Sequence, residues 1–249
     1  MCTFFTYLHS YLIPRSLILL FLLITPFVVL SFYLGLLGLS EGLINVSELN
    51  RLTWRSTNDS LSLHMITGSV LTSIAPLQFL RSRFQKARVL HRVLGYIVVS
   101  LAFLTCIGGI IYIVIHGTRG GLWMNMGFGI YGAFLVLSAF FVVYYARKEN
   151  LRLHEEWGLR FILLSLGSWF YRVCYGVLIF IDPTCPGHTI DFRGPFDFFM
   201  NFAFYLLPLL FLEIYLRVYK MSDTQYRLWI FTLNFFLFIG TYGFYKVLI

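Results

Sequence analysis

The chain has 249 residues, of which 59% are hydrophobic, 19% are aromatic and only 12% are charged. Soluble domains carry about 25% charged residues, so this composition excludes a soluble globular domain and a disordered chain. The net charge of +8 is not gathered in a basic module apart from the hydrophobic runs, which argues against a nucleic-acid partner. The composition predicts an integral membrane protein whose main partner is the lipid bilayer.

Seven apolar runs are each long enough to cross a bilayer as a helix, which takes about 20 residues. Because the hydrocarbon core has no water to satisfy backbone polar groups, runs of this length are expected to be helical. We therefore predict an all-α, polytopic helical bundle that forms one transmembrane domain over 1–249, with spans two to five as a four-helix core. The spans are expected at about 17–39, 61–80, 93–115, 122–146, 158–181, 198–216 and 228–245.

Lysine and arginine predict the orientation of these spans. Thirteen of them fall in the N-terminus and in the loops after spans two, four and six, and five fall in the opposite set of segments. Cytoplasmic loops are the more basic ones, so the N-terminus is expected in the cytoplasm and the C-terminus outside. Two N-glycosylation sequons, which begin at Asn45 and Asn58, then lie in the first outer loop.

Three histidines at or near span ends share one local pattern, in which a glycine follows four residues later. Residues four apart lie on the same face of a helix, one turn from each other. A glycine there leaves space beside the imidazole for a flat group, although small residues also serve ordinary helix packing in membranes. The three motifs are HMITG (64–68), HRVLG (91–95) and HEEWG (154–158).

We expect His91 and His154, which begin the third and fifth spans on the cytoplasmic side, to be the axial ligands of one b-type haem iron. Gly95 and Gly158 would leave room for the macrocycle. The alternative is that both histidines bond to interfacial loops, and that the basic loops bind anionic lipid headgroups. The residues expected to bind haem propionates or a small anionic electron donor are Arg88, Arg92 and Arg160.

A second site near the opposite membrane surface is a further hypothesis. His64, followed by Gly68, begins the second span from outside, but the fourth span supplies no histidine to pair with it. The other ligands available there are His116, Met124 and Met126, since methionine also binds haem iron. The methionines equally well pack as ordinary apolar side chains, so one haem is favoured over two.

Arg172 lies inside the fifth span, where an unpaired charge costs on the order of 3 kcal/mol. We predict that it forms a structural ion pair with Asp197, near the outer end of the sixth span. The alternative is a site for an anion or a quinone.

These motifs together resemble a membrane family, domain of unknown function 2306. The resemblance covers about 64–175 and rests on HMITG, Pro76-Leu-Gln78-Phe-Leu-Arg81, HRVLG followed by Tyr96, and HEEW followed by Arg160. The usual motif of the family at the fifth span is His-x-x-Trp-Met, whereas here Gly158 follows Trp157. The family has no established activity, so the resemblance implies fold and membership only.

HRVLG, with Lys86 and Arg88 upstream, is also similar to the third-span motif of the transmembrane cytochromes b that take electrons from ascorbate. That likeness implies that His91 and His154 hold the cytoplasmic haem of a four-helix core. The fourth-span histidine of those proteins has no counterpart here. We predict an electron-transfer protein that would act as a transmembrane oxidoreductase. Two alternatives stay open: a membrane carrier or lipid-interacting protein without enzymatic activity, and an accessory subunit without cofactor.

Overall fold

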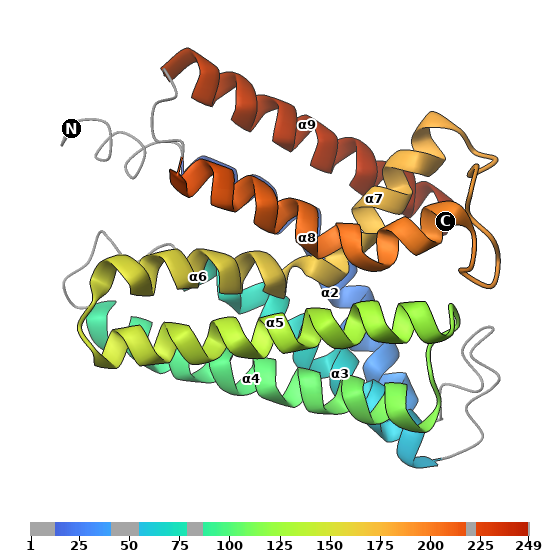
Figure 1. Cartoon of the computed structure of the whole chain (residues 1–249), viewed down its shortest axis with the longest axis horizontal. Coiled ribbons are helices and arrows are strands. Elements are labelled where there is room, and N and C mark those ends of the chain that lie inside the picture. Colours follow the sequence, from blue (N-terminus) through green and yellow to red (C-terminus); the bar gives the residue numbers. More distant parts are fainter. Residues whose placement is uncertain (1–12, 41–54, 79–86, 218–222, 249) are drawn as a thin grey trace. The chain divides into compact units, whose positions relative to one another are not determined.

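The computed structural model describes residues 13–40, 55–78, 87–217 and 223–248, which form eight helices and no strand (Figure 1). The chain divides into two compact units, Met1–His116 and Gly117–Ile249. Unit 1 contains α2 (Ile13–Ser40), α3 (Arg55–Ile74) and α4 (Ala87–Ile115). Unit 2 contains α5 (Leu122–Arg147), α6 (Leu151–Ser165), α7 (Gly167–Ile181), α8 (Pro195–Arg217) and α9 (Asp223–Leu248).

The helical membrane bundle predicted from composition is confirmed. Five helices, α2, α3, α4, α5 and α8, are each long and apolar enough to cross a membrane, and α6 with α7 forms a sixth crossing if the bent pair is one span. The protein is therefore an integral, multi-pass membrane protein. The predicted seventh span, 228–245, lies within α9, and the side chains of the first part of that helix lie outside the described residues.

In unit 1, α3 packs against both α2 and α4. A Cβ atom at Gly108 would lie only 2.7 Å from the Ser60 carbonyl oxygen, so α3 and α4 approach each other as closely as glycine allows. Association of helices in lipid depends on such close packing and on hydrogen bonds between helices. One of these bonds joins α3 to α2, because the Asn58 side-chain amide donates to the Gly38 carbonyl.

In unit 2, α5 and α6 form an antiparallel hairpin, and α8 packs against α5, α6 and α7 (Figure 1). The turn between the two helices of the hairpin is short, and α6 begins where the Asn150 side chain accepts a hydrogen bond from the Leu153 amide at 3.2 Å. Asparagine is a favoured N-cap residue because its oxygen satisfies an amide that has no helical partner. The cap fixes the start of α6 and with it the position of His154.

The predicted span 158–181 is wrong as a single straight helix. It begins earlier, at Leu151, and it is broken at Leu166, where α6 and α7 meet at a bend of 54°. Glycine and serine near each other are a common cause of such breaks, and here Ser165 and Gly167 flank Leu166. The Tyr131 hydroxyl on α5 donates to the Leu164 carbonyl at 2.6 Å, which satisfies a backbone oxygen beside the break.

The other half of the broken span, α7, packs against α9 through glycines on both helices. A Cβ atom at Gly176 would overlap the Gly240 carbonyl, and one at Gly243 would overlap the Gly176 carbonyl. The broken span therefore has two different neighbours, with α5 beside α6 and α9 beside α7.

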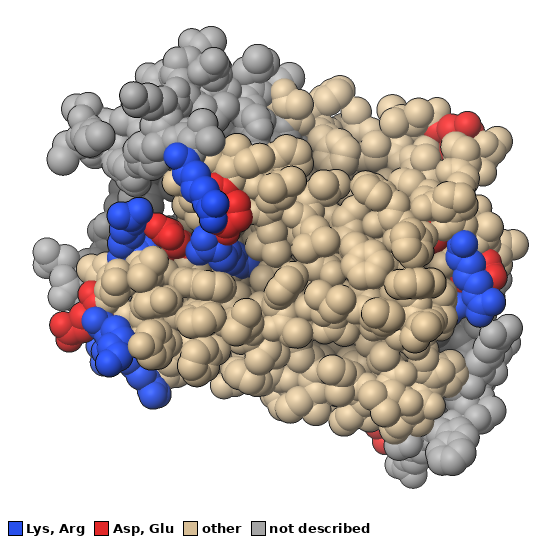
Figure 2. Space-filling model, viewed as in Figure 1, with Lys and Arg blue, Asp and Glu red and all other residues tan. Residues whose placement is uncertain are grey.

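Charge is distributed along α5 and α8 as expected for membrane crossing. Figure 2 shows Lys, Arg, Asp and Glu toward the ends of these two helices, with a broad uncharged surface over their middle. Large apolar side chains of the same two helices, such as Ile130, Phe140 and Leu210, are exposed, which is suitable for contact with lipid chains.

Candidate functional site

His154 lies in the first turn of α6 and contacts the helix before it. Its Nδ1 atom is 3.0 Å from the Val142 carbonyl oxygen of α5. Because the carbonyl can only accept, Nδ1 carries the proton and the lone pair of the neutral imidazole lies on Nε2. One turn further along, a Cβ atom at Gly158 would have no heavy atom of the described structure within 4 Å. That this glycine leaves room for a flat group beside His154 stays a prediction.

Arg160, which was predicted to bind an anion, contacts Glu213 and Trp157 within unit 2. Its Nε atom is 2.6 Å from Glu213 Oε1 on α8, and its guanidinium lies 4.8 Å from the centre of the Trp157 ring. Trp157 also stacks on Phe141 of α5, with ring centres 4.4 Å apart. In the structure the guanidinium joins α6 with α8, and the role of Arg160 in binding an anion stays a prediction.

His91 lies near the start of α4 in unit 1 and is partly exposed. Arg92 beside it is exposed, Gly95 is surrounded by open space as Gly158 is, and the Arg88 side chain lies outside the described residues. His91 and His154 belong to different units, and each unit is described by itself. Their pairing across one haem therefore stays a prediction.

The hypothetical second site is not assembled within either unit. The His64 imidazole packs on α4, where its Nδ1 atom is 2.8 Å from the Thr105 carbonyl and a Cβ atom at Gly109 would lie 2.9 Å away. His116 instead stacks on Tyr112, with ring centres 5.4 Å apart. These are packing contacts, and a role of either histidine as a ligand stays a prediction. The remaining residues of this hypothesis divide between the units: Gly68 lies beside Thr105 in unit 1, and Met124 and Met126 lie on α5 in unit 2.

The predicted ion pair between Arg172 and Asp197 is not formed. Arg172 donates from Nη1 to the Ser168 carbonyl of its own helix at 2.8 Å. Asp197, whose side chain is 0% exposed, takes all its hydrogen bonds from elsewhere. Its Oδ2 atom accepts from the backbone amides of Thr189 and Gly194, at 2.9 and 3.0 Å, because the loop between α7 and α8 folds over the start of α8.

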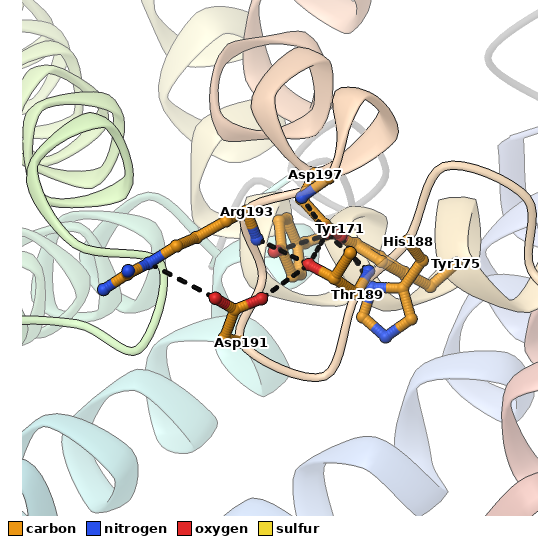
Figure 3. Close-up of polar contacts among 8 residues, drawn as sticks. Tyr171, Tyr175, His188, Thr189, Asp191, Arg193 and Asp197 are labelled. Carbon is orange, nitrogen blue, oxygen red and sulfur yellow. Dashed lines mark hydrogen bonds and ion pairs between the residues drawn. The ribbon is translucent and has the colours of Figure 1, made fainter.

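Two further side chains complete the environment of Asp197, and sequence reasoning missed both. The Tyr175 hydroxyl donates to Oδ1 at 2.6 Å, and His188 Nδ1 lies 2.7 Å from the same oxygen (Figure 3). Tyr175 in turn contacts the Tyr171 hydroxyl at 3.2 Å. A signal was available: Gly194-Pro195 is typical of a helix start, which places Asp197 in the first turn, where an acid accepts backbone amides.

Comparison with known proteins gives one match, to the model of the family described as predicted membrane protein (DUF2306), over residues 61–187. The match covers just over half of the chain. The chain belongs to the DUF2306 family. No curated protein and no solved structure matches it.

The DUF2306 match includes the three histidine motifs, Tyr171 and Tyr175, and it ends one residue before His188. The aspartate–histidine pair therefore lies just beyond the part of the chain that the DUF2306 family model covers. Within the described residues, no three His, Cys, Asp or Glu side chains are grouped as ligands of a metal ion.

Proposed function

We propose that this protein is a membrane-embedded electron carrier that binds one b-type haem, with His154 as one axial ligand and His91 as the other. The observation that carries the proposal is the contact between His154 Nδ1 and the Val142 carbonyl. Histidines that bind metals usually donate their second ring N–H to a carbonyl or a carboxylate, which fixes the tautomer and the ring orientation. His154 has this partner, and Nε2 is the ligand atom that the tautomer provides.

The glycines support the same assignment. A haem that lies against a helix needs a surface without side chains beside its axial ligand, and Gly158 offers such a surface one turn after His154. Gly95 stands in the same relation to His91, and a Cβ atom placed on it would again have no heavy atom within 4 Å. His91 is assigned as the second ligand by this shared motif.

Arg92 is the described residue best suited to a haem propionate, because it is exposed and adjacent to His91, whereas Arg160 is paired with Glu213. A bound haem would supply one-electron redox chemistry, while the protein would set its orientation and its exposure to water. The concentration of lysine and arginine on one side supports an orientation with the N-terminus in the cytoplasm and the C-terminus outside. A small anionic electron donor or an anionic lipid headgroup would then meet the protein on the cytoplasmic side.

The test is the absorption spectrum of protein purified after expression with haem available. The proposal expects a Soret band and reduction of the haem by dithionite, both lost in His91→Ala and His154→Ala and kept in His9→Ala as the matched histidine control. Gly158→Leu sharpens the test, because the open space around this glycine should admit the side chain without unfolding while blocking a macrocycle. Absence of a Soret band in the wild type, or a band unchanged in both ligand variants, would rule out the proposal and leave a lipid-interacting protein or an accessory subunit.

A further inference from the structure

Unit 2 contains a continuous line of hydrogen-bonded side chains that reaches the surface at the loop between α7 and α8. Tyr171 and Tyr175, one turn apart on α7, are joined through their hydroxyls at 3.2 Å. Tyr175 donates to Asp197 Oδ1, which also contacts His188 Nδ1 (Figure 3). The His188 side chain is 25% exposed and Tyr171 is buried, so the line leads from the surface into the helices.

Each of these four groups can both accept and donate a proton. A proton that binds His188 Nε2 from water allows Nδ1 to pass its own proton to Asp197. The protonated carboxyl group then donates to the Tyr175 oxygen, and Tyr175 passes its hydroxyl proton to Tyr171. His188, Asp197 and Tyr175 each gain one proton and lose one, and Tyr171 passes its own hydroxyl proton to water, so no net charge is left on the side chains. Figure 3 shows one ring nitrogen of His188 toward Asp197 and the other turned away from it.

A purely structural role accounts for only part of this line. The amides of Thr189 and Gly194 tie the loop to Asp197, whereas the contact of Tyr175 with Tyr171 joins two residues of one helix and holds no loop residue. Among the described residues no Lys or Arg pairs with Asp197, and the charged side chains of the same loop, Asp191 and Arg193, lie 3.5 Å from each other. Ionisable groups inside membrane helices are costly and commonly mark ion or proton pathways.

A separate observation extends the line along α8. Asn201 and Tyr205 lie one and two turns beyond Asp197 on the same face, and each residue is 2% exposed. The Asn201 Oδ1 atom and the Tyr205 hydroxyl have no hydrogen-bond partner among the described residues. Pro208 has no amide hydrogen, so the Phe204 carbonyl lacks its helical donor. Two side-chain atoms without partners and a backbone carbonyl without its helical donor, within about one turn of an apolar helix, favour binding of water there.

We infer that unit 2 transfers protons along α8, between His188 at one end and the ion pair of Glu213 with Arg160 at the other. Glu213 lies eight residues beyond Tyr205, about 12 Å along the helix, and its side chain is 30% exposed. The path then has a titratable, water-accessible group at each end and polar atoms between them. This function is independent of haem and of the histidines proposed to bind it.

Proton flux into vesicles tests the inference directly. Purified full-length protein is reconstituted into phospholipid vesicles that contain a pH-sensitive dye, and a potassium diffusion potential is imposed with valinomycin. The wild type should acidify or alkalinise the interior faster than protein-free vesicles, depending on the sign of the potential. Asp197→Asn should reduce the flux to the rate of protein-free vesicles, whereas Asp191→Asn, an exposed carboxylate of the same loop, should leave it unchanged.

Pro208→Ala keeps the test valid if Asp197→Asn fails to fold. It supplies an amide hydrogen to the Phe204 carbonyl and favours the helix, so it should lower the flux while thermal stability is maintained or increased. A wild type no faster than protein-free vesicles would overturn the inference. Wild-type flux in folded Pro208→Ala protein, or in folded Asp197→Asn protein, would overturn it as well.

Discussion

Arg160 on α6 and Glu213 on α8 place Nε and Oε1 2.6 Å apart, and the guanidinium also lies over the ring of Trp157. The two side chains are 16% and 30% exposed, so the pair is only partly screened by solvent. Arg160→Leu should therefore lower the free energy of unfolding by about 1.5–3 kcal/mol, the range for a hydrogen bond to a charged group. The matched change Arg152→Leu removes an exposed pair with Glu156 and should cost about 0.3–0.5 kcal/mol.

Thermal or denaturant unfolding of the two variants in the same detergent measures the difference. Equal effects would show that the contact between α6 and α8 adds no more than a surface pair. A double-mutant cycle with Glu213→Leu then gives the coupling free energy itself.

Two glycines of unit 2 should respond in opposite ways to alanine. Gly176→Ala places a methyl group against the Gly240 carbonyl, so α7 and α9 must separate, at a cost of about 1–3 kcal/mol. Gly158→Ala meets no neighbour and should stabilise α6 by up to about 1 kcal/mol through helix propensity. Unfolding temperatures of the pair check both signs, and destabilisation by Gly158→Ala would contradict the open surface beside His154.

Cys185 offers a test of orientation with a defined pH dependence. Burial and the nearby charge of Asp182 raise the pKa of this thiol, so at neutral pH less of it is thiolate than in an ordinary cysteine. Hydrogen bonds from Thr184 lower the pKa of Asp182, which therefore stays ionised. Labelling by a maleimide should be slow at neutral pH and accelerate as the pH rises. Asp182→Asn removes the charge, lowers the thiol pKa and should increase the rate at neutral pH.

The orientation itself is read from intact cells. With Cys2, Cys106 and Cys174 changed to serine, a membrane-impermeant maleimide should label Cys185 from outside, and Cys185→Ser should abolish the signal. Labelling that appears only after the cells are opened would place the loop in the cytoplasm and reverse the proposed orientation.

Asn58 should remain unglycosylated even in a eukaryotic host. The sequence makes it a sequon of an outer loop, but in the structure it lies in α3, is 8% exposed and donates its amide to the Gly38 carbonyl. An acceptor asparagine must be accessible to the transferase. Glycosidase treatment should therefore give the same mobility shift, or none, in Asn58→Gln and wild type, whereas the other sequon, Asn45, lies outside the described residues.

The lengths of the apolar runs predicted most of the fold, since each predicted span lies within or close to a helix of the structure. The break at Leu166 escaped prediction because the sequence there has no proline, although Ser165 and Gly167 flank it. In the structure it coincides with the contact of Tyr131 with the Leu164 carbonyl and with different neighbours for the two halves.

The pairing of Arg172 with Asp197 failed for a related reason. The pairing was predicted only from the depth of the two residues in the membrane, and this depth does not determine the path of the loop between α7 and α8. Cys185, Gly187 and Phe192 have positive φ angles there, and the turns they make bring backbone amides and His188 to the carboxylate. Local backbone geometry of this kind leaves little trace in a composition or a helical period.

The glycine contact of α7 with α9 has a consequence for biogenesis. During synthesis α7 emerges before its partner, so its small-residue face waits in the bilayer until α9 has been made. Unit 2 can mature only once both helices are in the membrane. A nascent chain stalled before residue 223 would expose this face to chaperones and membrane proteases.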